Sequence, residues 1–341
     1  MNYCKDNRDK MLVYSFCMTI LIVIYHLVPH LIDLIDFRGG YKYYRNFFEL
    51  FGSIALNYFF AASAYKYFVS CKTMKEKICN RLRTLLIPYF TWNTIYIFLY
   101  VLQNGIPSVK TLILGYTINP FDGPLWYIFV LFIFFILFGK KINYKNVRVF
   151  KGFIIMISVI FALFHFCVVK ELFNFPYAYW LERTCRMIPP FLVGGYLARE
   201  PKYNQYTYHG NKLLLISALV ISILLATYIG DGAIAILLMY LCTFGIWIAC
   251  PNFELRKSSL MRQDTFSIYA IHEGIIVVIL ALIYKLKILV SSMVGIMCIM
   301  VIELILIISF GLIINLLLKK LPPFFDTMLT GGRNSKKSKV Y

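Results

Sequence analysis

The sequence predicts an all-α integral membrane protein with about ten transmembrane helices. Two observations lead to this prediction: 60% of the residues are hydrophobic and only 15% are charged, and long apolar runs recur along all 341 residues. So few polar residues would not cover a water-soluble fold of this length. The composition therefore excludes a soluble enzyme, and a lipid bilayer remains as the solvent.

Each apolar run is near the length that a helix needs to cross a bilayer, roughly 20 residues for about 30 Å of hydrocarbon. We expect one transmembrane domain, residues 11–318, between a cytoplasmic N-terminal segment, residues 1–10, and a basic cytoplasmic tail, residues 319–341. No polar stretch is long enough for a second core. The predicted spans are Met11–His30, Phe47–Ser70, Leu85–Leu102, Leu125–Phe138, Gly152–Val169, Ala178–Ala198, Leu213–Ile229, Ala233–Ala249, Phe266–Tyr284 and Leu289–Leu317.

The distribution of positive charge predicts the orientation. A net charge of +19 would suggest nucleic acid in a soluble protein, but basic residues of membrane proteins gather in cytoplasmic loops. With the amino terminus inside, 25 of the 35 lysines and arginines fall in cytoplasmic segments and nine in outer segments, and Lys66 lies within the second span. We therefore expect both termini in the cytoplasm, membrane lipids as partners and no nucleic acid.

The nine cysteines stand singly and form no C-x-x-C pair. This pattern favours neither a disulfide framework nor a zinc site. We expect no metal in the functional site.

Ionisable residues inside a membrane are costly and therefore mark candidate sites. By helical rise, His26 lies about 22 Å along the first span, in the outer half of the bilayer. A neutral imidazole there suits proton abstraction from a hydroxyl that arrives from outside. A histidine hydrogen-bonded between helices for packing is an equal alternative. His165 lies in the middle of another span, with no motif around it.

The second span carries Asn57, Ser63 and Lys66. Alanines around Ser63 form a small-residue face that lets another helix or a thin substrate approach closely. Close helix packing is the simpler role for them. Lys66 is near enough to the inner end to extend its ammonium group to the surface.

Two arginines, Arg81 and Arg83, stand at the cytoplasmic start of the third span, before Pro88. Arginines bind phosphate groups bidentately, so an anionic cytosolic donor such as a nucleotide-bearing coenzyme is a candidate ligand. The preference of basic residues for inner loops explains the same pair without a ligand.

Further polar residues lie in later spans. Trp126 begins the fourth span beside a tyrosine, where an aromatic belt at the headgroups would explain it. Glu182 and Arg186 are four residues apart in the sixth span, so they can pair on one helix face. Two prolines then interrupt that helix. The ninth span places His272 and Glu273 on its inner half, at a depth different from that of His26.

The order of these motifs resembles the acyltransferase-3 family, from about residue 9 to residue 318. Each motif alone is weak, whereas their order and topology together are more specific. The matching residues are His26 in the first span; Phe59, Phe60 and Ser63 in the second; Arg81, Arg83, Pro88 and Tyr89 in the third; Leu125, Trp126 and Tyr127 in the fourth; Arg186, Pro190, Phe191, Gly194 and, one place late, Tyr196 in the sixth; and Ser267, Tyr269 and His272 in the ninth.

The chain departs from the family pattern at two places. Members usually carry an arginine 11 residues before the histidine of the first span, where this chain has Ser15. The S-G-[FY] motif of the second span reads Ser63, Ala64 and Tyr65 here. The first change removes the expected charge partner, and the second restricts close backbone approach.

The resemblance implies a ten-span bacterial enzyme of the plasma membrane that moves acetyl or other acyl groups from cytosolic acyl-CoA, its co-substrate, to a surface glycan or lipid-linked sugar. Arg81 and Arg83 would hold the donor phosphates. His26 would act as general base or carry the acyl group covalently. Six residues would line the acceptor side, stabilise oxyanion charge or support the site: Asn57, Ser63, Trp126, Arg186, His272 and Glu273.

Two alternatives use the same buried polar groups without acyl chemistry. A transporter or flippase for a lipid-linked sugar needs neither a coenzyme site nor a base at one fixed depth. A non-catalytic descendant of the family is compatible with Ser15 at the arginine position.

Overall fold

A computed structural model describes residues 3–33, 41–117, 119–140, 147–173, 177–199, 212–230, 232–249, 265–285 and 293–333, together with residues 175 and 261. This part of the chain is helical and contains no strand. Residues 334–341 of the predicted basic tail lie outside it.

The protein is an all-α membrane protein, as the composition predicts. Six helical stretches are long and apolar enough to cross a membrane: Asp9–Pro29, Asn46–Val69, Met74–Asn104, Arg148–Val169, Phe266–Ile283 and Met297–Leu318. Three shorter apolar helices, Gly123–Phe138, Leu214–Ile229 and Ala233–Ile248, correspond to three further predicted spans. The remaining predicted span, the sixth, is divided into two short helices.

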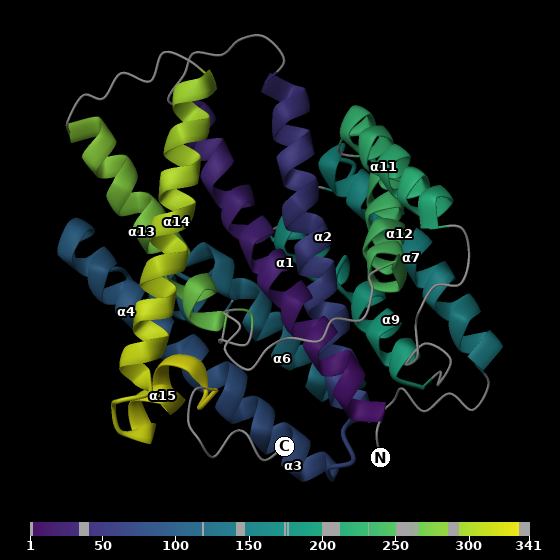
Figure 1. The fold of residues 1–341 in the computed structure, drawn as a ribbon, viewed down its shortest axis with the longest axis horizontal. Coiled ribbons are helices and arrows are strands. Elements are labelled where there is room, and N and C mark those ends of the chain that lie inside the picture. The colour runs from purple at the N-terminus through teal and green to yellow at the C-terminus, as the bar shows by residue number, and fades with distance from the viewer. Residues whose placement is uncertain are drawn as a thin grey trace. The chain divides into compact units, whose positions relative to one another are not determined.

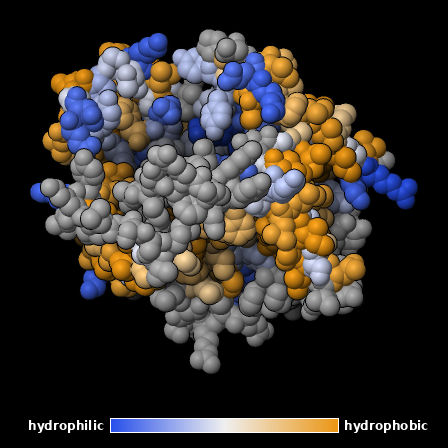
Figure 2. All heavy atoms as spheres, turned by 90° about the horizontal axis from the view of Figure 1, so that it is seen from above, coloured by the Kyte–Doolittle hydropathy of each residue, from blue (hydrophilic) through white to orange (hydrophobic). Residues whose placement is uncertain are grey.

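Hydrophobic side chains cover much of the surface, as a bilayer requires. Leu102, Leu214 and Phe98 are 67%, 67% and 61% exposed. Figure 2 shows broad areas of hydrophobic side chains, with smaller groups of hydrophilic ones between them. An apolar surface of this extent is stable against lipid rather than water.

The chain divides into two compact units, each made of two separate stretches. Unit 1 contains residues Met1–Cys71 and Lys140–Arg262, and unit 2 contains residues Lys72–Gly139 and Gln263–Tyr341.

Unit 1 is built around α2, which packs against α1, α9, α11 and α12 (Figure 1). The closest approach is at Gly194 of α9, where an added β-carbon would collide with the Ala61 carbonyl of α2. This contact confirms that the small residues of the second span permit close packing. The helices of unit 1 are α1 (Tyr3–Asp33), α2 (Tyr41–Val69), α7 (Val147–Val169), α8 (Ala178–Cys185), α9 (Ile188–Arg199), α11 (Lys212–Ile229) and α12 (Ala233–Ala249).

Unit 2 contains a continuous helical stretch of three parts: α3, a π-helical turn η1 and α4. A C-terminal helix, α15, packs against α4 and η1, and α13 packs along α14 (Figure 1). Part of the segment predicted as a basic tail is therefore folded. The helices of unit 2 are α3 (Met74–Arg81), η1 (Leu82–Leu86), α4 (Ile87–Asn104), α5 (Val109–Thr117), the 3₁₀ turn η2 (Gly123–Leu125), α6 (Trp126–Phe138), α13 (Phe266–Lys285), α14 (Met293–Leu318) and α15 (Pro323–Thr330).

Candidate functional site

His26 lies on α1, three residues before the end of the apolar stretch Asp9–Pro29. Its ring is half-buried and meets the ring of Tyr25 edge-on, with centroids 4.7 Å apart. Gly52 of α2 makes room for Tyr25, because a β-carbon on Gly52 would lie 2.6 Å from that ring. The α1–α2 contact thus fixes the backbone orientation at the position of His26.

A buried ion pair lies in the same unit, between α7 and α8. Glu182 is 2% exposed. Its Oε1 lies 2.8 Å from His165 Nδ1 and 3.4 Å from Arg186 Nε. The predicted pairing of Glu182 with Arg186 is confirmed. Arg186 stands where the helix is interrupted before Pro189 and Pro190, and its carbonyl accepts a 2.7 Å hydrogen bond from the Tyr240 hydroxyl.

The partner of His165 was not predicted. Its spacing of 17 residues from Glu182 follows no helical period, and the chain between them turns at Glu171, whose φ is +56°. The only sequence signal is an ionisable residue in each of two consecutive apolar segments.

The charges of this cluster reach Tyr25, the neighbour of His26. Glu49, Arg183 and Arg186 all lie close enough to interact electrostatically with the Tyr25 hydroxyl. Two arginines from the α8–α9 region therefore stand near the end of α1 that carries His26. At the position of the missing family arginine, the Ser15 side chain instead hydrogen-bonds to the buried Tyr58 of α2.

Two other predicted residues of unit 1 lie on α2. Asn57 is 2% exposed, and its Oδ1 accepts no hydrogen bond within the described residues. An unsatisfied buried carbonyl is costly, so a polar ligand or water is expected against it. Ser63 is half-buried, two residues beyond the Ala61–Gly194 contact.

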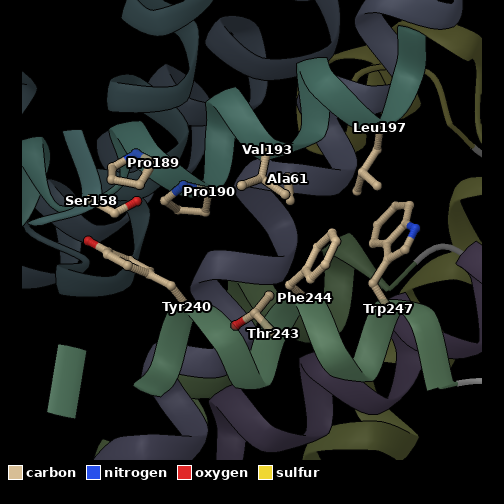
Figure 3. A pocket seen from close by; sticks show the side chains of 10 residues that line it. All are labelled: Ala61, Ser158, Pro189, Pro190, Val193, Leu197, Tyr240, Thr243, Phe244 and Trp247. Atoms are coloured by element: carbon tan, nitrogen blue, oxygen red, sulfur yellow. The ribbon is translucent and has the colours of Figure 1, made fainter. Parts of the chain in front are cut away.

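A small cavity lies between α2, α7, α9 and α12 of unit 1 (Figure 3). Its walls are mainly apolar and include Pro189, Pro190, Phe244 and Trp247. Its volume is about 30 Å³, against the roughly 300 Å³ or more of a typical ligand pocket. It has room for a water molecule and is not an acceptor site.

In unit 2, Arg81 and Arg83 differ in their surroundings. The Arg81 guanidinium lies over the Phe135 ring, 4.7 Å from its centroid. Arg83 is exposed and belongs to the π-helical turn, and its Nη2 donates a 3.2 Å hydrogen bond to the Thr327 hydroxyl of α15. π-helical turns inside α-helices are frequent at functional sites.

The remaining predicted residues of unit 2 are buried rather than lipid-facing. Trp126 is 6% exposed, so an aromatic belt at the headgroups does not account for it. Tyr127 beside it packs edge-on against Tyr269 of α13, with ring centroids 5.0 Å apart. His272 is fully buried one turn further along α13, and its Nδ1 contacts the Tyr269 carbonyl. Glu273 follows it and is half-buried.

Asp122 is a further candidate that sequence reasoning missed. It is 1% exposed, and neither carboxylate oxygen has a hydrogen-bond partner among the described residues. Burial raises the pKa of Asp122 well above its usual value, and the nearby charge of Glu273 raises it further. The available signal in the sequence was a charged residue in the apolar segment just before the fourth span.

The structure thus places the predicted residues in two groups. Unit 1 holds His26, Asn57, Ser63 and Arg186, and unit 2 holds Arg81, Arg83, Trp126, His272 and Glu273.

A comparison with protein families decides the assignment. The family model for the acyltransferase domain (Acyl_transf_3) matches residues 16–319. The chain belongs to the acyltransferase-3 family. No curated protein and no solved structure matches it.

The resemblance stated from the motifs is therefore confirmed, and the protein is a multi-pass membrane acyltransferase. The matched region of this acyltransferase extends from the residue after Ser15 to Lys319 and includes every predicted site residue. Helix α15 and Arg333, which contact the Arg83 turn, follow the matched region.

Proposed function

We propose that this acyltransferase transfers an acetyl or similar acyl group from cytosolic acyl-CoA to a hydroxyl of a cell-surface or lipid-linked glycan, in a bacterial plasma membrane. The observation that carries the proposal is the family match over residues 16–319, together with the ordered motifs within it. The proposal assigns donor binding to unit 2 and proton transfer to unit 1.

The donor is held through its phosphates by Arg81 and Arg83. Guanidinium groups pair bidentately with phosphate oxygens, and Arg83 is exposed to a soluble ligand. The ring of Phe135 under Arg81 holds one guanidinium at a fixed place. The proposed reaction uses no metal, because its leaving group is the CoA thiolate, which needs only to take up a proton.

His26 is the proposed general base. Its neutral imidazole takes the proton of the acceptor hydroxyl while the hydroxyl oxygen attacks the thioester carbonyl. Collapse of the tetrahedral intermediate forms the ester, breaks the carbon–sulfur bond and releases CoA, whose thiolate takes up a proton. A covalent acyl-His26 intermediate gives the same products in two steps.

The other residues support this chemistry in the proposal. Arg186, held by Glu182, stabilises negative charge on the acceptor side. Asn57 offers an amide with an unsatisfied oxygen to the acceptor, and Ser63 lies on the same helix. Trp126, His272 and Glu273 have supporting roles in unit 2.

The decisive experiment incubates the purified protein in lipid discs with radiolabelled acetyl-CoA and cell-surface glycan. Ester-linked, alkali-labile label on the glycan is the expected result. Coenzyme binding without label would identify a non-catalytic descendant. Movement of a lipid-linked sugar across the bilayer without label or coenzyme binding would identify a transporter.

Access of the donor from the cytosol requires a defined orientation, which a second experiment tests. Lys75 and Ile106 lie beyond opposite ends of the apolar part of Met74–Asn104, and Ile106 is 88% exposed. In a cysteine-free background, a membrane-impermeant thiol reagent added to intact cells should label Ile106→Cys and not Lys75→Cys. The reverse pattern would contradict the orientation and the cytosolic donor.

A further inference from the structure

Helix α15 ends in a two-glycine turn that leads into Arg333. The Gly331 amide donates to the Thr327 carbonyl and the Gly332 amide to the Asp326 carbonyl, both at 3.0 Å, and the first of these is the bond of the αL motif that ends many helices. Both glycines have positive φ, +73° and +79°, a conformation that other residues rarely adopt. The sequence Thr-Gly-Gly-Arg is therefore suited to this sharp turn.

The turn lies directly on η1. A β-carbon on Gly331 would be 2.6 Å from the Thr84 Cα, so no other residue fits there. A β-carbon on Gly332 would be 2.9 Å from Arg83 Nη2. The two glycines thus allow the C-terminal backbone to approach the Arg83–Thr84 segment.

Arg333 completes a hydrogen bond that the sequence of the third span leaves open. Pro88 has no amide hydrogen, so it cannot donate to the carbonyl of Thr84, four residues earlier. Arg333 Nη2 donates to that carbonyl at 2.8 Å, and its Nη1 donates to the Thr330 carbonyl at 2.8 Å. Arg333 is therefore held at the carbonyl that Pro88 leaves without a donor, one residue after Arg83.

Arg83 and Arg333 are therefore far apart in the chain but stand on two segments that pack against each other. Arg83 makes one hydrogen bond within the described residues, to the neutral Thr327 hydroxyl. The Arg333 guanidinium also lies over the Phe266 ring, 4.3 Å from its centroid. Arginines that stand on adjoining segments can bind one anion jointly, because each guanidinium pairs with phosphate oxygens.

We propose that Arg333, held by the two-glycine turn after α15, joins Arg83 in binding a phosphate group of the acyl-CoA donor. This inference rests on the proposed function, whose donor site it extends to a third arginine and to a helix outside the matched family region. Arg83 and Arg333 contact the phosphate group together, and Arg81 remains a further arginine of the proposed donor site.

The test compares a donor that carries phosphates with one that does not. Acetyl-CoA and S-acetylpantetheine, which lacks every phosphate, are titrated into Arg83→Gln, Arg333→Gln and wild-type protein in discs of zwitterionic lipid. Lys320→Gln is the matched control, since it removes one exposed positive charge from the same C-terminal segment. The tryptophan emission of the protein reports on the fold, and it includes Trp92, whose Nε1 donates to the Leu329 carbonyl of α15 at 2.8 Å.

Arg83→Gln and Arg333→Gln should each raise the Kd of acetyl-CoA about tenfold or more, the effect of a lost charge-assisted hydrogen bond. The Kd of S-acetylpantetheine and the tryptophan emission should stay as in wild type, and Lys320→Gln should change neither Kd. If Arg333→Gln weakens the binding of both ligands equally, or changes the tryptophan emission, Arg333 only holds α15 in place.

Other outcomes separate this inference from the proposed function. If Arg83→Gln weakens acetyl-CoA binding and Arg333→Gln does not, the inference alone is wrong. If both weaken it but no transfer is found, the phosphate site stands and the proposed activity fails. If Arg333→Gln binds acetyl-CoA normally but loses the ability of wild type to enrich phosphatidylglycerol from mixed discs, the pair binds a lipid headgroup and the inference is wrong.

Discussion

The two units differ in the partners of their charged side chains. In unit 1, Glu182 is buried between His165 and Arg186, so the charges are compensated within the protein. In unit 2, Arg83 is exposed on a π-helical turn and bonds only to a neutral hydroxyl among the described residues.

The difference predicts which property of the protein each group of charges should affect. A buried ion pair is destabilising to break, because its remaining member stays charged away from water. An exposed arginine costs little to remove unless a ligand depends on it. Stability should therefore respond to changes in the unit 1 cluster, and donor affinity to changes at the unit 2 turn.

The largest effect is expected at His26, whose neighbour Tyr25 interacts electrostatically with Arg183 and Arg186 of unit 1. His26→Ala should reduce acyl transfer by about 10²- to 10⁴-fold, the usual contribution of a general base. Donor binding and thermal stability should stay near wild type. The measurement is the rate of label transfer in discs.

His30, one helical turn further along α1, provides the control. His30→Ala should retain transfer. His165 is unsuitable for this purpose, because its loss would remove a partner of Glu182. Near-normal transfer by His26→Ala would show that the base lies elsewhere.

The next largest effect concerns stability. Glu182→Ala leaves Arg186 without its buried partner and should lower the free energy of unfolding by about 3 to 5 kcal/mol. Thermal unfolding in detergent measures it. Tyr179→Phe, on the same helix at a side chain 66% exposed, should stay within about 0.5 kcal/mol of wild type. Similar melting temperatures for both variants would mean that the ion pair contributes nothing to the fold.

The helices and the buried ion pair of unit 1 differ in how far the sequence alone predicts them. The apolar runs predicted the helices because a bilayer imposes a length and a composition on every span. Glu182 and Arg186 were predicted to pair because they lie four apart on one helix. His165 was not included, since its contact with Glu182 depends on how α7 and α8 pack.

The contacts of Arg333 and the burial of Asp122 in unit 2 were even harder to predict from the sequence. Arg333 meets the Thr84 carbonyl across 249 positions of the chain. Pro88 indicates that this carbonyl loses its helical donor, but no local pattern says which side chain replaces it. Asp122 was missed for a related reason: an aspartate beside glycine and proline is typical of an exposed turn, yet here it is buried.

A smaller effect should distinguish the two arginines of the third span. Arg83→Gln should weaken acetyl-CoA binding about tenfold, the loss of one charge-assisted hydrogen bond, whereas Arg81→Gln should weaken it less because Arg81 lies over Phe135. Titration of both variants measures the difference. Lys75→Gln on the exposed part of α3 is the control for net charge. Equal loss in all three variants would indicate general attraction of the donor to a basic surface.

The last effect concerns Asp122, the buried carboxyl of unit 2 that lacks a partner among the described residues. Because burial raises its pKa, the folded protein keeps a proton that the unfolded chain releases from about pH 4 upward. Stability is therefore lost as the pH rises from the unfolded pKa to the folded pKa, at up to about 1.4 kcal/mol per pH unit.

Asp122→Asn removes this loss, so its melting temperature relative to wild type should increase between pH 5 and pH 7. Glu171→Gln, at an exposed position of unit 1, is the control and should show no such trend. A pH-independent difference would mean that Asp122 is charged in the folded state. It would then need a cationic partner, and unit 2 would compensate its buried charge as unit 1 does.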